Sequence, residues 1–161
     1  MQRKKIKTKN LEIDSKKAKK FKIAIIASNF NADITDGMVA GAVAELRLAG
    51  LPAKNISLFR VPGSLEIPLV CKKLAISKKY DGLVAIGAVI KGETDHYYYV
   101  AGEAARGLID VGLETLVPIG FGIITTNNLK QARERSMGKN NKGNEAARAV
   151  LEVISLDLKG D

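Results

Sequence analysis

The stretch Val84-Ala-Ile-Gly-Ala-Val-Ile-Lys-Gly-Glu-Thr-Asp-His96 decides the fold of this chain. It is apolar until a lysine and a glycine end the run. An apolar run without charge is typical of a strand buried on both faces, as strands of parallel sheets are. Thr94 and Asp95 are helix N-cap residue types, so we predict that a helix begins there and carries His96 in its first turn.

The same succession of strand and helix is repeated along the chain. Buried strands are predicted over 21–28, 56–61, 82–90 and 116–124, and Pro118 favours an edge position or a strand start for the last. Helices are predicted over 34–50, from a cap at Ser64, over about 95–111, 128–137 and 144–158. Because strand and helix alternate four times, we predict an α/β fold. It is a three-layer flavodoxin-like domain with a four-stranded parallel sheet flanked by helices on both faces.

Composition and charge divide the chain into two parts. Of the 161 residues, 46% are hydrophobic and 27% charged, which is typical of a globular protein. Residues 1–22 contain ten Lys or Arg against two acidic residues, so they account for +8 of the net charge of +9. We therefore expect a basic amino-terminal arm over 1–20 and a single, nearly neutral domain over 21–161.

The arm raises the question of a nucleic-acid partner. No aromatic residue lies among its lysines, so bases have no stacking platform there, and a solvated tail is the commoner meaning of such a run. No apolar run reaches the length that a membrane span needs, and no secretion signal is evident. Cys71 cannot form an internal disulfide, and its apolar neighbours indicate a small buried hydrophobe rather than a nucleophile. We expect a cytoplasmic protein without nucleic-acid or membrane partners.

Aromatic and polar residues gather where the predicted strands end. In parallel sheets, ligands bind beyond the carboxyl ends of the strands. The segments at those ends are 29–31, 62–66, 91–96, 121–122 and 125–126. Together they hold carboxylates, a histidine and two phenylalanines, which could bind a flat ligand between rings and hydrogen-bond its edges. His96 lies beside free helix N–H groups that favour an anion, so it is a candidate for proton transfer, with a surface or packing role as the alternative.

Several of these segments carry a family resemblance. They are Asn29-Phe-Asn31, Val61-Pro-Gly-Ser-Leu-Glu-Ile-Pro68, Ile86-Gly-Ala-Val-Ile-Lys-Gly-Glu-Thr-Asp-His-Tyr97, Pro118-Ile-Gly-Phe-Gly-Ile-Ile-Thr-Thr126, Gln131-Ala-Arg-Glu-Arg135 and Asn141-Lys-Gly143. In this order and spacing, from about residue 21 to 158, the chain resembles the lumazine synthases. The resemblance implies a transferase that condenses 5-amino-6-(D-ribitylamino)uracil with 3,4-dihydroxy-2-butanone 4-phosphate. The product is 6,7-dimethyl-8-ribityllumazine, formed in the penultimate step of riboflavin biosynthesis without a cofactor or a metal.

The resemblance also implies roles for residues that would bind the pyrimidine substrate. Those roles fall to Phe30, which would stack on the ring, to Ser64, Leu65 and Glu66, which would hold the ribityl chain and a ring edge, and to Ala88, Val89 and Ile90, which would meet the pyrimidine through their backbone. The alternatives are a core position for Phe30 and, for Glu66, an ordinary first-turn glutamate favoured by the helix dipole.

A second set of residues is implied for the phosphorylated substrate and the chemistry. Glu93 and Thr94 would receive the phosphate through backbone N–H groups and the threonine hydroxyl, and Arg135 would supply a bidentate positive partner. His96 would be the general acid and base. Phe121 matches an aromatic position that a neighbouring subunit supplies. Lys142 matches a lysine near the substrates, with a solvated lysine as an equally good interpretation.

The resemblance implies a homopentamer with active sites between subunits, and riboflavin synthase as a further partner. Three positions depart from the family pattern. Leu65 stands where many relatives have Phe, Lys91 replaces a frequent Arg, and the segment 135–143 looks one residue shorter than in relatives that build capsids. The short segment favours pentamers, or loosely paired pentamers, over a closed capsid. Two other functions stay open: an archaeal-type riboflavin synthase, which dismutates two lumazines, and an RNA-binding module that uses the basic arm.

Overall fold

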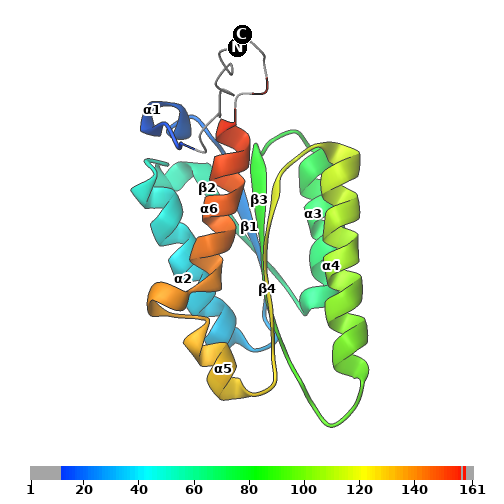
Figure 1. The fold of residues 1–161 in the computed structure, drawn as a ribbon. Coiled ribbons are helices and arrows are strands. Elements are labelled where there is room, and N and C mark those ends of the chain that lie inside the picture. The colour runs from blue at the N-terminus through cyan, green and yellow to red at the C-terminus, as the bar shows by residue number, and fades with distance from the viewer. Residues whose placement is uncertain (1–11, 157, 159–161) are drawn as a thin grey trace, which may run out of the picture.

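The computed structural model describes residues 12–156 and 158 (Figure 1). Its strands alternate with helices along the chain, as predicted. The helices are α1 (Ser15–Ala18), α2 (Ala32–Leu48), α3 (Ile67–Ile76), α4 (His96–Thr115), α5 (Leu129–Glu134) and α6 (Lys142–Ser155), and the strands are β1 (Ile23–Ser28), β2 (Ile56–Val61), β3 (Gly82–Ile90) and β4 (Ile119–Thr126). Short 3₁₀ turns lie at Ala53–Asn55, Ser64–Glu66 and Gly138–Asn140.

The four strands form one parallel sheet in the order β2-β1-β3-β4. The predicted three-layer α/β fold with a four-stranded parallel sheet is therefore confirmed, and β4, which follows Pro118, is an edge strand. The order is that of a flavodoxin-like sheet, whose winding reverses between β1 and β3. A crevice is expected at the carboxyl ends of these two strands because the connections that follow them leave on opposite faces of the sheet.

Two hydrophobic cores lie on the two faces of the sheet. Figure 1 shows α2 and α6 on one face and α3 and α4 on the other. Successive residues of β1 point to opposite faces, so Ile25 packs in the core with α2 and α6, whereas Ile26 packs in the core with α3 and α4. Every residue of β1 is buried, and so is all of β3 except Ile90, which explains the uninterrupted apolar runs in the sequence.

Some predicted boundaries and one predicted cap were wrong. The last strand begins at Ile119 rather than 116, because α4 continues to Thr115 and Leu116 then ends it in the left-handed region, at φ 57°. Ser64 does not cap a helix with its side chain. The Glu66 carboxylate instead reaches back, and its Oε2 accepts a hydrogen bond from the Gly63 N–H at 2.7 Å. The final helix begins two residues earlier than predicted, at Lys142.

The segment expected to be a basic arm contains an element that the sequence analysis did not predict. Residues 1–11 lie outside the described part of the chain. The following residues form the one-turn helix α1, capped by Asp14, whose Oδ1 accepts from the Lys16 N–H at 2.8 Å. Ala18 in this turn is fully buried in the α2/α6 core. The packed structure therefore begins before residue 21.

Cys71 is buried in the α3/α4 core, and burial raises the pKa of its thiol from 9.0 to about 12, so a thiolate is strongly disfavoured at neutral pH. This agrees with a small buried hydrophobe. None of the helices in the described residues is both long enough and apolar enough to cross a membrane.

Candidate active site

A cavity of about 410 Å³ opens at the carboxyl ends of the strands, beside the reversal point between β1 and β3. All eight residues predicted for the pyrimidine and for proton transfer line it. Its lining consists of Phe30, Gly63, Ser64, Leu65, Glu66, Ala88, Val89, Ile90, Gly92, Thr94, His96, Tyr97 and Val100. Phe30 is 71% exposed, so it is not a core residue, and its ring is available to a ligand.

The end of β3 offers its backbone to this cavity. β1 pairs with β3 only as far as Ala27 opposite Ile86, so within the described chain no strand lies beside residues 88–90 on that side. One group there is used, because the Asn31 side-chain amide donates to the Ala88 carbonyl at 2.9 Å. Unpaired backbone groups at a strand edge can hydrogen-bond a planar heterocycle as they would a neighbouring strand. This agrees with the backbone role predicted for Ala88, Val89 and Ile90.

The turn that follows β1 places the Phe30 ring. Its backbone is tied to the end of β2, where the N–H groups of Asn29 and Phe30 donate to the carbonyls of Val61 and Pro62 at 2.8 and 3.0 Å. Asn31 adopts the left-handed region, at φ 58°, where Asn is among the few non-glycine residues commonly found. The ring therefore stands on a backbone that is fixed from both β2 and β3.

The turn at Ser64–Glu66 contributes a further part of the cavity wall. Ser64 is only 6% exposed, and a side chain at Gly87 would overlap its Oγ, so the absence of a Cβ at Gly87 lets this turn approach β3. Leu65 is about half exposed at the cavity, where its aliphatic chain provides an apolar surface. The Glu66 carboxylate caps the turn through Oε2, which gives it a structural role alongside any contact to substrate.

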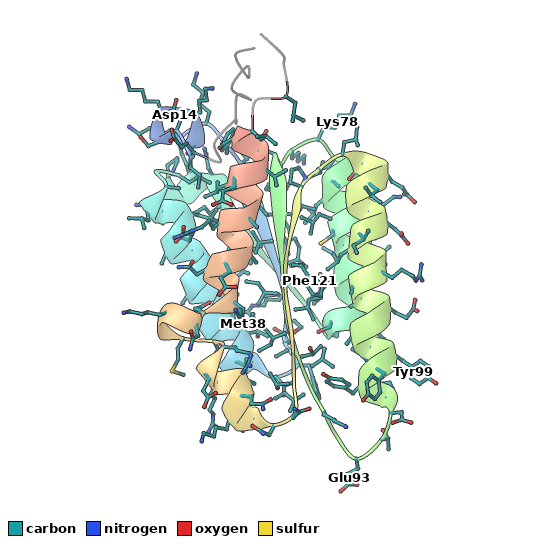
Figure 2. The ribbon with its side chains drawn as sticks, viewed as in Figure 1. Asp14, Met38, Lys78, Glu93, Tyr99 and Phe121 are labelled. Carbon is teal, nitrogen blue, oxygen red and sulfur yellow. The ribbon has the colours of Figure 1, made fainter. Side chains whose placement is uncertain are left out.

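The loop after β3 carries the groups predicted for the phosphate and the proton transfer. Thr94 and His96 line the cavity, and His96 is the first residue of α4, where the first backbone N–H groups lack helical partners. Glu93 does not line it. Figure 2 shows Glu93 at the tip of the loop, with its carboxylate directed away from the body of the molecule. Lys91 turns toward α4, with Nζ 6.0 Å from the centre of the Tyr98 ring.

Three predicted residues lie elsewhere, in a second recess of about 520 Å³ between β4, α6 and the segment after α5. These are Phe121, Arg135 and Lys142. Phe121 lies in the edge strand β4 (Figure 2) and is 53% exposed. The second recess shares no lining residue with the cavity at Phe30 and His96. One chain thus presents the predicted site as two separate parts.

The two cations of the second recess differ in their partners. One N–H of the Arg135 guanidinium donates to the Gln131 carbonyl at 3.0 Å, which leaves most of its five donors for a ligand. Lys142 is paired with Glu145, and its Nζ lies 2.8 Å from both carboxylate oxygens. Arg135 is therefore the better candidate for binding an anion in this recess.

Some lining residues were missed by the sequence analysis. Tyr97 and Val100 face the cavity from the first turns of α4, one turn apart on the helix, and the amphipathic spacing beyond His96 could have indicated them. No role was predicted for Asn31, whose side-chain amide donates to the Ala88 carbonyl at the cavity. In the described residues, no group of three or more His, Cys, Asp or Glu side chains could hold a metal ion.

Comparisons with known proteins give a consistent result. The sequence profile of a family described as 6,7-dimethyl-8-ribityllumazine synthase matches residues 20–157. The chain is 49% identical over 150 residues to the 6,7-dimethyl-8-ribityllumazine synthase of Nitratidesulfovibrio vulgaris (strain DP4), which covers 92% of this chain and 94% of that protein. It is 46% identical over 139 residues to the enzyme of the same name from Lawsonia intracellularis, covering 86% and 88% of the two chains. A third relative of that name, from Leuconostoc mesenteroides, is 48% identical over 136 residues, or 84% and 87% of the two chains. Because the profile match covers the whole sheet and helices α2 to α6, this chain belongs to the 6,7-dimethyl-8-ribityllumazine synthase family.

Proposed function

We infer that this chain catalyses the 6,7-dimethyl-8-ribityllumazine synthase reaction of riboflavin biosynthesis, at a site completed by a second copy of the chain. The activity, a transferase activity, follows from the family and from relatives of that name. The substrates are 5-amino-6-(D-ribitylamino)uracil and 3,4-dihydroxy-2-butanone 4-phosphate. The main observation in support of this site is the cavity at the reversal point, which is lined by Phe30, the open edge of β3 and His96.

The proposed mechanism assigns one part of the cavity to each part of the reaction. The pyrimidine stacks on Phe30 and pairs with the backbone of residues 88–90, while its ribityl chain lies along Ser64, Leu65 and Glu66. Its 5-amino group attacks the butanone carbonyl, and water leaves to form an imine. Loss of inorganic phosphate, ring closure and loss of a second water complete the lumazine.

Each of these steps moves a proton, and His96 is placed to move it. It stands at the start of α4, beside Thr94 and the free N–H groups that favour the phosphate of the second substrate. A general acid and base must lie within hydrogen-bond reach of the group that it protonates. A phosphate bound at Thr94 would share the cavity with the imidazole of His96, which also lines it.

A direct assay tests the activity against the alternatives. The purified chain with both substrates is expected to form the lumazine, followed by its absorbance, and to release inorganic phosphate. With the lumazine alone it is expected to form no riboflavin. Riboflavin formed from the lumazine alone, without condensation, would instead support the archaeal-type riboflavin synthase. Retention of RNA in a manner that depends on residues 1–20 and on salt would support the RNA-binding module.

The shared site explains why one chain holds the predicted residues in two places. In the proposed assembly, a homopentamer, Phe121, Arg135 and Lys142 of one copy approach the cavity of the next. The exposed ring of Phe121, on an edge strand, is then buried against a neighbour. A cytoplasmic location, expected from the composition, and riboflavin synthase as a partner, implied by the resemblance, stay predictions.

Subunit mixing tests this arrangement. His96→Ala damages the cavity, and Arg135→Ala damages the second recess. If each site combines two copies, unfolding and refolding a 1:1 mixture restores intact sites in about one quarter of the positions, from random pairing around a ring. Each variant refolded alone is the control. Activity no higher than the mean of the two controls contradicts the shared site, and the native mass of the particle gives its copy number relative to the 17.3 kDa chain.

A further inference from the structure

The segment from Arg135 to Lys142 joins the two cations of the second recess. Arg135 is the cap residue directly after α5 and Lys142 begins α6, with a 3₁₀ turn at Gly138–Asn140 between them. The segment closes on itself, because the Lys142 N–H donates to the Arg135 carbonyl at 2.9 Å. The backbones of the two cations are therefore in direct contact, and whatever holds this segment sets the position of both.

One buried side chain holds it. Asn141 is 6% exposed, and its amide makes four hydrogen bonds. Nδ2 donates to the Gly37 and Ser136 carbonyls, both at 2.8 Å, and Oδ1 accepts from the N–H groups of Gly143 at 2.9 Å and Asn144 at 3.2 Å. Both amide hydrogens and the carbonyl oxygen are thus in use, in contacts that join α2, the end of α5 and the first turn of α6.

Glycines make room for this arrangement. A Cβ at Gly41 of α2 would overlap the Asn141 side chain, and a Cβ at Gly143 would overlap the Met38 carbonyl of α2. The start of α6 therefore lies directly against the backbone of α2, with the Asn141 amide filling the space left at Gly41. A side chain of different shape cannot make the same set of contacts.

We propose that Asn141 is a positioning residue for the phosphorylated substrate: it holds the segment that carries Arg135 and Lys142 against α2, and so places the Arg135 guanidinium for the phosphate. The proposal rests on the function proposed above for Arg135. A planar guanidinium binds phosphate through two parallel N–H groups, so it depends on orientation more than a point charge does. Misplacement of a binding group by about 1 Å can cost about 100-fold in rate.

Asn141→Asp is the most selective test of this role. It keeps the size of the side chain and the oxygen that caps α6, but it replaces the donating NH₂ by an oxygen that faces the Gly37 and Ser136 carbonyls. Repulsion there should move the turn away from α2 while leaving α6 capped. We expect kcat/KM for the phosphorylated butanone to fall about tenfold, within the range of a small displacement, while KM for the pyrimidine changes by less than about twofold.

Two further variants separate positioning from a general loss of stability. Glu45 is also 6% exposed and joins the same two helices, α2 and α6, through Oε1, which accepts from Arg148 Nε at 2.7 Å. It lies outside both recesses. Glu45→Gln should lower the melting temperature and leave kcat/KM for the butanone within about twofold. If Asn141→Asp does not fold, Asn141→Ser, which keeps a short cap acceptor but cannot span to Gly37, takes its place.

A double-mutant cycle with Arg135→Ala provides the decisive measurement. If Asn141 acts through Arg135, its substitution should lower kcat/KM for the butanone about tenfold in the wild-type background and less than about twofold in the Arg135→Ala background. Equal losses in both backgrounds, or equal losses for both substrates, would overturn the proposal. If Arg135→Ala itself leaves butanone use unchanged, the proposed function of the second recess fails, and this inference with it. If only Asn141→Asp is without effect, the inference alone fails.

Discussion

Arg135→Ala is expected to lower kcat/KM for 3,4-dihydroxy-2-butanone 4-phosphate about 100-fold, equivalent to about 2.7 kcal/mol of binding and transition-state stabilisation. The guanidinium carries five donors, and the residues that the structure describes engage only one of them, which donates to the Gln131 carbonyl. The phosphate would otherwise rely on Thr94 and helix N–H groups, which carry only partial charge. Steady-state kinetics with each substrate varied in turn should place most of the loss on the butanone.

Arg133, two residues before Arg135, provides a matched control for this prediction. It is in α5, the short helix that Arg135 follows, is largely exposed, and lies near Asp33 at 4.0 Å rather than in the recess. Arg133→Ala should therefore leave both KM values nearly unchanged. Arg135→Lys should recover part of the loss, because it restores charge without the planar pair of donors. Equal weakening for both substrates, or the same loss in the Arg133 variant, would argue against a phosphate-specific role.

His96→Ala is expected to lower kcat about 100-fold, at the lower end of the range for general acid and base residues. We expect the lower end because water that enters the cavity with the substrates can take over part of the proton transfer. KM for the pyrimidine should stay nearly unchanged, because the stacking ring and the β3 backbone are untouched. Single-turnover kinetics with saturating substrates measures the effect on the chemical steps directly.

Chemical rescue tells a chemical role of His96 from a packing role. Removal of the side chain leaves a space at the start of α4 that opens to the cavity. Free imidazole should therefore restore part of the rate of His96→Ala and leave the wild-type rate unchanged. Turnover of the variant at the wild-type rate would show that His96 only shapes the cavity wall.

The sequence was informative where burial is uniform. β1 and β3 are the two central strands of the sheet, and strands covered on both faces need continuous apolar residues, which is the pattern seen in the chain. Their carboxyl ends could be located for the same reason, and with them the segments that carry Phe30 and His96. Boundaries were less predictable. Leu116 ends α4 in a left-handed conformation, and nothing in an apolar run that continues into β4 marks that position.

The packed turn α1 was not predicted, because its lysines indicate an exposed segment. Of the four residues of α1, Ala18 is the one that is buried in the core. The cap after β2 was placed on Ser64 because serine is a common cap, whereas the longer Glu66 side chain reaches the Gly63 N–H and leaves Ser64 against β3. In both cases the contacts with a neighbouring element, rather than local sequence preference, decide which residue is buried or which side chain caps the turn.

By itself, the sequence determined that strands and helices alternate around a four-stranded parallel sheet, and at which end of the strands a ligand would bind. Both follow from the apolar runs and from the residues that come after them. Only the tertiary structure decided that Phe121 and Arg135 lie in a recess separate from the cavity of Phe30 and His96. It also decided that the Asn141 amide joins α2 to the segment between the two cations. The physical reason is distance along the chain: Gly37 and Asn141 are 104 residues apart, and their hydrogen bond exists only because β1, β3 and β4 bring α2 and α6 together on one face of the sheet.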